Sequence, residues 1–307
     1  MRILGHIHTF NDEDVIDRSL AALLAQTHPV DEVLLVDNGS TDSTLRRPLP
    51  PNVTVIRHRQ NLGTSGAVIT GLQYATSNSY DWIWVLDADA APHEDALEKL
   101  LSLYQTFPAH IQEQTWLLAS LPVDAGSHRP IHGVIFSPRG QHSVSPRPGD
   151  EYYEFDATVW TGCLFKLKAV RQIGLPSADY VLDWGEYEYG YCGKLAGLRA
   201  FMHTRSIVDH NIGGCPSMGL VTYRLGPLSY RLFELPPIRC YYLVRNMIYF
   251  WLFEFEPRRF TTFLPKFLKA LHITANFLVR PSTHRAELVA CLRGIRDGFS
   301  KRLHHRY

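Results

Sequence analysis

The sequence lacks the features that mark secreted, disulfide-linked or membrane-spanning proteins. Its 307 residues include 5 cysteines, an odd number without a Cys-x-x-Cys pair, which favours a reducing compartment over a disulfide framework. No apolar run reaches the roughly 18 residues that a spanning helix needs. The acidic stretch after "MRILGHIHTF" also predicts no secretory signal. We therefore expect a cytoplasmic globular protein.

Net charge is also in short supply. The formal value is +1, so no overall field attracts nucleic acid, and we expect no such partner. The charges are unevenly spread, however. Residues 1–90 hold 6 Lys/Arg against 11 Asp/Glu, whereas residues 256–307 hold 11 against 3. The basic C-terminal region is therefore a candidate contact surface.

The usual glycine-rich nucleotide loops are missing too. The segment "NLGTSGAVITG" (61–71) does not read Gly-x-Gly-x-x-Gly, and no Gly-Lys-Ser/Thr follows it. This argues against a dinucleotide-binding loop and against a P-loop. The segment instead places Asn61 and Gly63 just before a helix expected at 65–77.

The N-terminal third contains an alternation of apolar strands and amphipathic helices. We expect strands at 2–10, 32–37, 53–58 and 82–87, with helices at 11–27, at 65–77 and from Pro92 onward. In this reading Asn11 is an N-cap and Pro92 a first helical residue. The order of elements predicts an α/β fold with a mainly parallel sheet and helices on both faces.

Polar residues end three of these strands. Thr9, Asp37 and Asp87 would meet at the carboxyl rim of the sheet, where such folds bind ligands. In "WIWVLDADAAP", Asp87 and Asp89 are two apart on an extended segment and so point the same way. Paired carboxylates suit Mg²⁺ or Mn²⁺ bound to a diphosphate. The alternative is a solvated turn before a helix and, for Asp37 with Asn38, an Asx turn.

The middle of the chain offers a second group of acids. We expect a strand at 157–167 through Gly162, and a helix at 185–197. "VLDWGEYEYGY" (181–191) carries Asp183, Glu186 and Glu188, which suit a general base and hydroxyl-binding groups. Acids at a helix start also interact favourably with its dipole, which is the structural alternative. His210 in "VDHNIGG" is a candidate metal or phosphate ligand, or a structural histidine.

In this order, the segments "IHTFNDED", "AQTHPVDEVLLVDNGSTDST", "NLGTSGAVITGL" and "VLDADAAPHEDALEKL" resemble glycosyltransferase family 2, which has the GT-A fold. The similarity covers about residues 3–250 and is strongest to the rhamnosyltransferase and galactofuranosyltransferase-like branch, which also matches "DWGEYEY", "HNIG" and "YYLVRN". It implies a Rossmann-like GT-A catalytic domain at 1–237, with a nucleotide-binding half at 1–115 and an acceptor half at 116–237, followed by a helical extension at 238–307.

The resemblance implies metal-dependent, inverting transfer of a hexosyl or deoxyhexosyl unit. The donor would be a nucleoside-diphosphate sugar, with UDP or dTDP favoured, and the acceptor a hydroxyl of a glycan, a lipid-linked molecule or another compound. Surface polysaccharide or glycoconjugate synthesis would be the setting. The implied nucleotide-binding residues are Thr9, Asn11, Asp37, Asn38, Asn61, Gly63 and Asp87.

The resemblance also assigns the remaining site residues. Asp87, Asp89 and His210 would hold Mg²⁺ or Mn²⁺, and the acceptor or sugar would meet Trp160, Gly162 and Trp184. The family's base is normally Asp, but this chain has Glu186 there, so the base stays open between Glu186, Glu188 and Asp183. The same departure supports an alternative: a degenerate sugar-nucleotide-binding protein without transferase activity.

The basic tail has two interpretations. Residues 258–280 mix Phe and Leu with Arg and Lys, which fits a helix lying on the inner face of an anionic membrane. It equally fits a helix packed on the catalytic domain. We expect helices over 238–305 that break at Pro257, Pro265 and Pro281. A homodimer is a further expectation.

Overall fold

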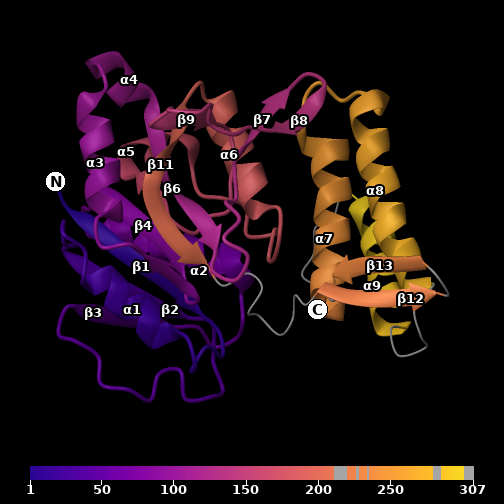
Figure 1. Cartoon of the computed structure of the whole chain (residues 1–307), viewed down its shortest axis with the longest axis horizontal. Helices are drawn as coiled ribbons and strands as arrows, with labels where there is room; N and C mark the ends of the chain where they lie inside the picture. Colours follow the sequence, from indigo (N-terminus) through magenta and orange to yellow (C-terminus); the bar gives the residue numbers. More distant parts are fainter. Residues whose placement is uncertain (211–219, 226–227, 234, 279–284, 301–307) are drawn as a thin grey trace. The chain divides into compact units, whose positions relative to one another are not determined.

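The computed structural model describes residues 1–210, 220–225, 228–233, 235–278 and 285–300 (Figure 1). Contacts divide the chain into two compact units, and each is considered by itself. The first comprises Met1–Phe136, Gln141–Ala178 and Glu186–Asn211. The second comprises Ser137–Gly140, Asp179–Gly185 and Ile212–Tyr307. The division at residue 237 expected from the sequence stays a prediction.

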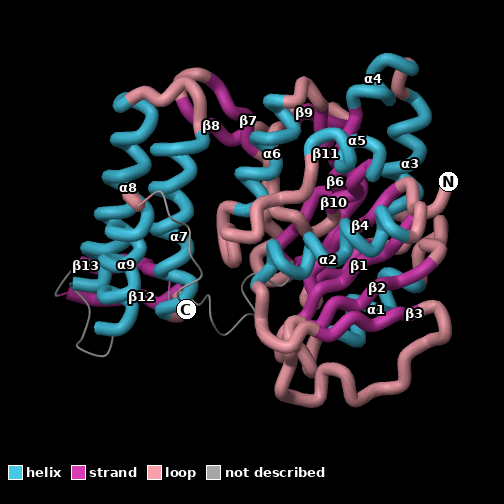
Figure 2. Tube along the Cα trace, turned by 180° about the vertical axis from the view of Figure 1, so that it is seen from behind, coloured by secondary structure: helices cyan, strands magenta, loops and turns pink. Residues whose placement is uncertain are grey.

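The first unit is built on a large twisted sheet (Figure 2). Its strands in spatial order are β3 (Val53–Arg57), β2 (Glu32–Asp37), β1 (Ile3–Thr9), β4 (Trp82–Asp87), β10 (Cys163–Lys166), β6 (Thr115–Asp124), β11 (Arg199–His210) and β5 (Ala90–Pro92), while β9 (Tyr152–Phe155) also pairs with β11. The first four run parallel, β10 runs antiparallel to both neighbours, and β11 runs parallel to β6. The predicted mainly parallel α/β sheet is confirmed.

Helices cover both faces of this sheet. One face carries α2 (Gly63–Ser77), α5 (Leu167–Ile173) and α6 (Gly185–Leu195), and the other carries α1 (Ile16–Leu24), α3 (Ala96–Thr106) and α4 (Ala109–Gln114). Successive residues of one strand enter different buried clusters: Val85 packs under α2, whereas Trp84 and Leu86 pack under α1 and α3. Coverage on both sides explains why "WIWVL" is apolar throughout.

Three local expectations are wrong. The helix expected from residue 11 begins at Ile16, because Asn11 adopts a left-handed φ of 58° and its Oδ1 accepts from Thr41 N. Pro92 ends β5 instead of beginning a helix, since β5 pairs with β11. The strand expected at 157–167 is limited to Cys163–Lys166.

The second unit is mostly helical. It contains α7 (Pro237–Tyr249), the π-helix η2 (Phe250–Glu254), α8 (Phe260–Leu278) and α9 (Arg285–Gly298), with a β12 (Leu220–Leu225) and β13 (Leu228–Phe233) hairpin. The strands β7 (Val134–Ser137) and β8 (Gly140–Ser143) form a separate pair. Contrary to expectation, Pro265 lies inside α8. Pro281 is outside the described residues. No described helix is both long and apolar enough to span a membrane.

The packing of α9 on α7 depends on small residues. A Cβ added to Gly294 would lie 2.7 Å from Tyr241 O, and one added to Gly298 would lie 2.9 Å from Arg245 O. Both distances are shorter than normal van der Waals contact, so a larger residue would push the helices apart. Gly294 and Gly298 therefore allow α7 and α9 to pack closely within the second unit.

Candidate functional site

The carboxyl ends of β1, β2 and β4 meet at one edge of the sheet. In the parallel register Thr9 pairs with Asp37, and His8 pairs with Asp87. Thr9 Oγ1 donates to Asp12 Oδ2 at 2.9 Å, so Thr9 holds a further acid at this edge. Burial raises the pKa of Asp12, and the charge of Asp89 adds to the increase. The edge thus concentrates carboxylates from several segments.

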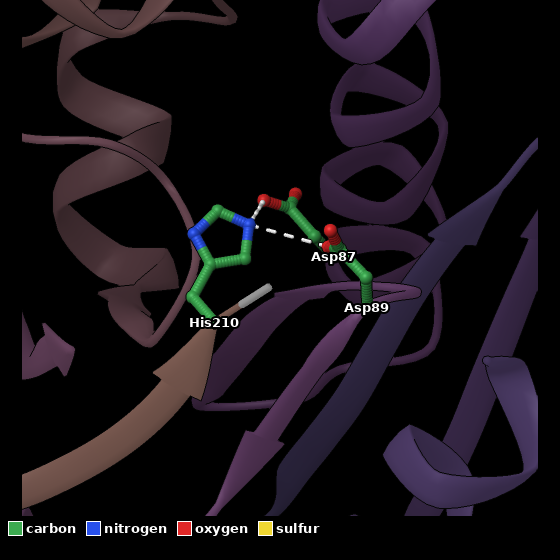
Figure 3. Close-up of side chains that lie close together, drawn as sticks. All are labelled: Asp87, Asp89 and His210. Atoms are coloured by element: carbon green, nitrogen blue, oxygen red, sulfur yellow. Dashed lines mark ion pairs between the residues drawn. The ribbon is translucent and has the colours of Figure 1, made fainter. Parts of the chain in front are cut away.

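Asp87, Asp89 and His210 form a compact cluster at this edge (Figure 3). Each contributes one ligand atom, and these atoms lie within 4.8 Å of one another. His210 Nε2 is 3.1 Å from Asp87 Oδ2 and 3.2 Å from Asp89 Oδ1. His210 reaches the acids because β11 pairs antiparallel with β5, which sets His210 opposite Ala90. The predicted convergence of the three residues is present.

The electrostatics of the cluster are those of a cation between two acids. Burial lowers the pKa of His210, but hydrogen bonds and charges from Asp87 and Asp89 outweigh it and raise the value to about 10. Burial also opposes ionisation of Asp87, yet its two imidazole partners hold its pKa well below the usual range. The arrangement therefore favours a positive charge between the two carboxylates.

His8 is a member of this site that sequence reasoning missed. Its Nε2 lies 2.9 Å from Asp87 Oδ1, and the residue is buried. Asp87 is thus held by one imidazole from β1 and another from β11. The signal was present in "HIHT": side chains two apart in a strand share a face, and the β1–β4 register places that face beside Asp87.

The residues of the cluster fit a divalent cation. Carboxylate oxygens are the preferred ligands of Mg²⁺ and Mn²⁺, and an imidazole nitrogen tilts the set toward Mn²⁺. His210 must lose its proton to bind a metal, so cation and proton compete for the same place. The donor set and its negative charge therefore match the expected cofactor.

Asp37, Asn38 and Asn61 are engaged in contacts near the end of β2. Asp37 is fully buried; its Oδ1 accepts from Ser40 N at 3.0 Å, and its Oδ2 is 3.1 Å from Arg57 Nε. Asn38 Nδ2 donates to Gly63 O, and Asn61 Oδ1 accepts from Gly63 N. These bonds tie the strand to the start of α2. Their role in nucleotide binding stays a prediction.

A surface pocket lies beside Asp37. Its volume is about 400 Å³, within the range of small-molecule sites. It is lined by Ser40, Thr41, Asp42, Leu45, Arg46 and Arg57. Arg57 belongs both to this lining and to the ion pair with Asp37, so a ligand in the pocket would be close to the buried carboxylate.

The two acids of α6 have different surroundings. Glu188 accepts from Ser177 N at 3.3 Å and from Cys192 Sγ at 3.2 Å, and burial raises its pKa. Residues two apart on a helix do not share a face, so Glu186 points elsewhere. Burial raises the pKa of the Cys163 thiol, with further contributions from Asp87 and Glu186.

Asp183 belongs to the second unit, in a segment that α7 holds by its backbone. Asn246 Nδ2 donates to the carbonyls of residues 182 and 183 at 2.8 Å, and buried Arg245 donates to the carbonyl of residue 179. Asp183 pairs with Arg239 at 3.2 Å. Asp183 and Trp184 have φ of 56° and 70°, the left-handed region. The "YYLVRN" motif thus anchors the chain that leads into α6.

The three residues expected to meet the acceptor or sugar are engaged in packing and hydrogen bonds within their own units. Trp160 is buried in the first unit. Gly162 N–H donates to Val85 O at 2.8 Å, and Gly162 O accepts from Trp84 Nε1. The φ of Gly162 is 80°, a backbone conformation that would be strained in a residue with a side chain. Trp184 packs on Phe250 in the second unit. Their contact with an acceptor stays a prediction.

Comparison with known proteins bears on the edge that carries these acids. The family model described as glycosyl transferase family 2 matches residues 6–119, which include β1, β2, β4 and the Asp87–Asp89 pair. Residues 6–119 are therefore similar to glycosyl transferase family 2. The resemblance noted in the sequence is confirmed for this part of the chain.

Two curated relatives show how far the similarity reaches. Galactofuranosyltransferase GlfT1 of Mycobacterium tuberculosis is 26% identical over 191 residues, which cover 61% of this chain and 62% of that protein. The UDP-N-acetylglucosamine–dolichyl-phosphate N-acetylglucosaminyltransferase of Methanococcus voltae is 31% identical over 112 residues, 31% of this chain and 44% of the relative. The matches therefore span less than two thirds of either relative.

Solved structures resemble the fold of this chain. GalNAc-T7 with UDP, GalNAc and Mn²⁺ aligns with a TM-score of 0.61 at 14% identity, over 97% of this chain and 54% of that one. S. aureus TarS 1–349 in complex with UDP-GlcNAc gives 0.56 at 16% identity, over 96% and 82%. At such identities the likeness establishes the GT-A type of fold.

Proposed function

We propose that the protein is a metal-dependent, inverting glycosyltransferase that moves a sugar from a nucleoside-diphosphate sugar to an acceptor hydroxyl. The observation that carries the proposal is the Asp87–Asp89–His210 cluster, located at the carboxyl edge of the sheet that includes the residues similar to family 2. Sheets of this type bind ligands at that edge. The cluster combines oxygen ligands with negative charge, as a cation that accompanies a diphosphate requires.

The donor half of the reaction would use the edge of the sheet. Asp87, Asp89 and His210 would hold Mn²⁺ or Mg²⁺, which when bound neutralises charge that develops on the leaving diphosphate. Asp37, which lies beside the pocket, would accept a hydrogen bond from the nucleobase of the donor. Thr9, Asn11, Asn38, Asn61 and Gly63 would shape the backbone around the nucleotide.

Glu186 would act as the general base. It would take the proton of the acceptor hydroxyl as the oxygen attacks the anomeric carbon, while the bond to the diphosphate breaks on the opposite face. The choice over Glu188 and Asp183 rests on the family resemblance, in which Glu186 occupies the position of the usual base Asp. The charges of Glu186 and Asp87 both raise the pKa of the Cys163 thiol, which supports a position of Glu186 near the Asp87 cluster.

The donor is proposed to be a UDP- or dTDP-sugar. Similar structures were solved with UDP and with UDP-GlcNAc, and one relative is named a galactofuranosyltransferase. A glycan or lipid-linked acceptor is proposed because the Methanococcus voltae relative is named for a lipid-linked acceptor, dolichyl phosphate. Polysaccharide or glycoconjugate synthesis is accordingly the proposed role.

A donor screen tests the proposal. The protein is heated with UDP-, dTDP- and GDP-sugars, each with Mn²⁺, with Mg²⁺ and with a chelator. A cognate donor is expected to raise the melting temperature with a metal and to lose most of this effect with the chelator. Release of nucleoside diphosphate is then measured with a panel of hydroxyl acceptors.

Two outcomes would contradict the proposal in different ways. Stabilisation by a donor without hydrolysis or transfer across the panel would favour the degenerate sugar-nucleotide-binding protein. Failure of every nucleotide sugar to stabilise the chain, with or without metal, would remove the donor assignment itself.

A further inference from the structure

The helices α8 and α9 of the second unit expose large apolar side chains. On α8 the exposed fractions are 71% for Phe260, 53% for Leu268 and 39% for Leu271. Half-buried Leu264 and exposed Ala275 complete the row. The five positions are spaced by four, four, three and four residues, which confines them to roughly 80° of the helix surface. They form a continuous apolar row along α8.

The neighbouring helix extends this row. On α9, Val289 and Leu292 are 44% and 52% exposed, and Phe299, the residue that follows the helix, is 44% exposed. The Phe299 ring lies 5.9 Å from the Phe263 ring and 5.5 Å from the Phe267 ring. The chain just after α9 therefore packs on the first half of α8, where Phe263 and Phe267 adjoin the exposed row. We call the exposed apolar residues of the two helices the α8–α9 patch.

Packing within the unit uses other faces of the same helices. Thr262, Ala270, Thr274 and Phe277 are buried on α8. On α9, Ala290, Cys291, Gly294 and Gly298 are buried, and the two glycines lie against α7. Each helix therefore has a face packed within the second unit, and the α8–α9 patch is additional to it. A patch of this kind marks an interaction site.

The charges around the patch indicate its partner. Among the described residues of 256–300, exposed cationic side chains are numerous, whereas Glu256 is the one exposed acid, paired with Arg258 at 3.0 Å. The exposed cations are Arg258, Arg259, Lys269, Arg285, Arg293 and Arg296. An apolar centre with basic flanks matches a surface that is apolar inside and anionic outside.

A second copy of the chain is a poorer match. A twofold contact through the α8–α9 patch would bring its cationic flanks close to those of the other copy, and like charges would oppose the association. A spanning insertion is also a poor match, since no described helix is long and apolar enough. An anionic lipid surface satisfies both the apolar row and its flanks.

We propose that the α8–α9 patch docks the protein on the headgroup region of an anionic membrane, with Phe260, Leu268 and Leu271 entering the acyl boundary. The surface belongs to the second unit and does not depend on the proposed sugar transfer. It would bring the enzyme to an acceptor that is itself held in a membrane.

Vesicle flotation of the full chain tests the proposal. Wild-type protein is expected to float with vesicles of phosphatidylcholine and phosphatidylglycerol, and to float less as salt increases. The double variant Leu268→Glu, Leu271→Glu should reduce the bound-to-free ratio about tenfold or more, because two apolar contacts are replaced by charges. The matched control is Leu175→Glu, Leu195→Glu, which changes two exposed leucines of the first unit and should bind like wild type.

The basic flank is tested separately. Lys269→Gln and Arg285→Gln should each weaken binding to the anionic vesicles about fivefold. The pair Lys168→Gln, Arg171→Gln removes two exposed charges of the first unit and should have little effect. Circular dichroism and donor binding verify that each variant is folded and that the sugar-nucleotide site is unchanged.

Three results would overturn the docking proposal. The first is no flotation of wild type with anionic vesicles. The second is equal flotation of the Leu268→Glu, Leu271→Glu variant and its control. The third is a wild-type dimer in sedimentation that this variant converts to monomer without any vesicle binding, which would reassign the α8–α9 patch to self-association. Loss of donor turnover with intact flotation would instead count against the proposed function alone.

Discussion

Asp37 and Asp87 end neighbouring parts of the same parallel sheet, yet they are satisfied in different ways. Asp37 is bonded locally, by Ser40 three residues on, with Arg57 of the adjacent strand beside it. Asp87 is bonded by His8 and His210, from strands at opposite ends of the first unit's sequence. One carboxylate closes a turn, and the other joins a nonlocal cluster.

The difference separates an acid held by local bonds from an acid that can exchange its partner for a metal cation. A carboxylate that accepts from a local backbone N–H is needed in its place whatever ligand is bound. A carboxylate held by two imidazoles can exchange a protonated side chain for a metal cation with the same sign of charge. We therefore expect changes at the two ends to differ in their response to metal.

The largest effect is expected at the Asp87 end. Asp89→Ala should lower kcat at saturating donor by about 10³, because the cation that neutralises the leaving diphosphate loses a ligand. Asp14→Ala, which removes an exposed acid of the same unit, is the control. Equal turnover of Asp89→Ala and wild type would remove the cluster from the mechanism.

The next largest fall in kcat is expected from changing Glu186, the proposed general base. Glu186→Gln is expected to lower kcat by about 10² to 10³ while donor binding by calorimetry stays unchanged, since only proton removal is lost. Glu188→Gln serves as the matched change two residues along α6. If Glu188→Gln causes the larger loss of kcat, the assignment of the base is reversed.

His8 should affect the metal more than the chemistry. His8→Phe removes one of the two imidazoles on Asp87, and loss of such a supporting contact commonly costs 10- to 100-fold in metal affinity. The Mn²⁺ concentration for half-maximal turnover should rise accordingly, with kcat largely restored at high Mn²⁺. A defect that no Mn²⁺ concentration relieves would mean that His8 acts otherwise; exposed His142→Gln is the control.

The smallest effect is expected at the Asp37 end. Asp37→Asn retains an oxygen for Ser40 N–H, so the free energy of unfolding should fall by about 1 kcal/mol. Donor affinity should weaken roughly tenfold, because the hydrogen bond from the nucleobase to Asp37 is altered. The stabilisation that Mn²⁺ gives in thermal unfolding should match wild type. A loss of that Mn²⁺ effect would erase the distinction between the two aspartates.

Much of the first unit was predictable because its signals are local. The apolar runs of β1, β2, β3 and β4 and the polar residues that end them follow from burial on both faces of a parallel sheet. The convergence of Asp87, Asp89 and His210 came from the family resemblance, since 120 residues of sequence separate the histidine from the acids.

The errors arose where a distant segment decided the outcome. Asn11 looks like an N-cap, but its side chain bonds Thr41, 30 residues away. Pro92 resembles the first residue of a helix, but it pairs with Val208 of β11 and so belongs to the sheet. His8 escaped notice because its role depends on the register between β1 and β4, which no single strand reveals.

The hydrogen bonds from α7 to the backbone before α6 have a consequence for which side chains of that segment can change. Arg245 and Asn246 grip main-chain carbonyls, which every amino acid possesses, in the segment before α6. Half-buried Leu182 can therefore be exchanged while the backbone path into Glu186 is kept, whereas Tyr180 and Val181 are buried and Tyr180 also donates to Glu254. If the proposed acceptor site includes this segment, residues 179 and 182 are the positions at which its side chains can vary without loss of the buried contacts.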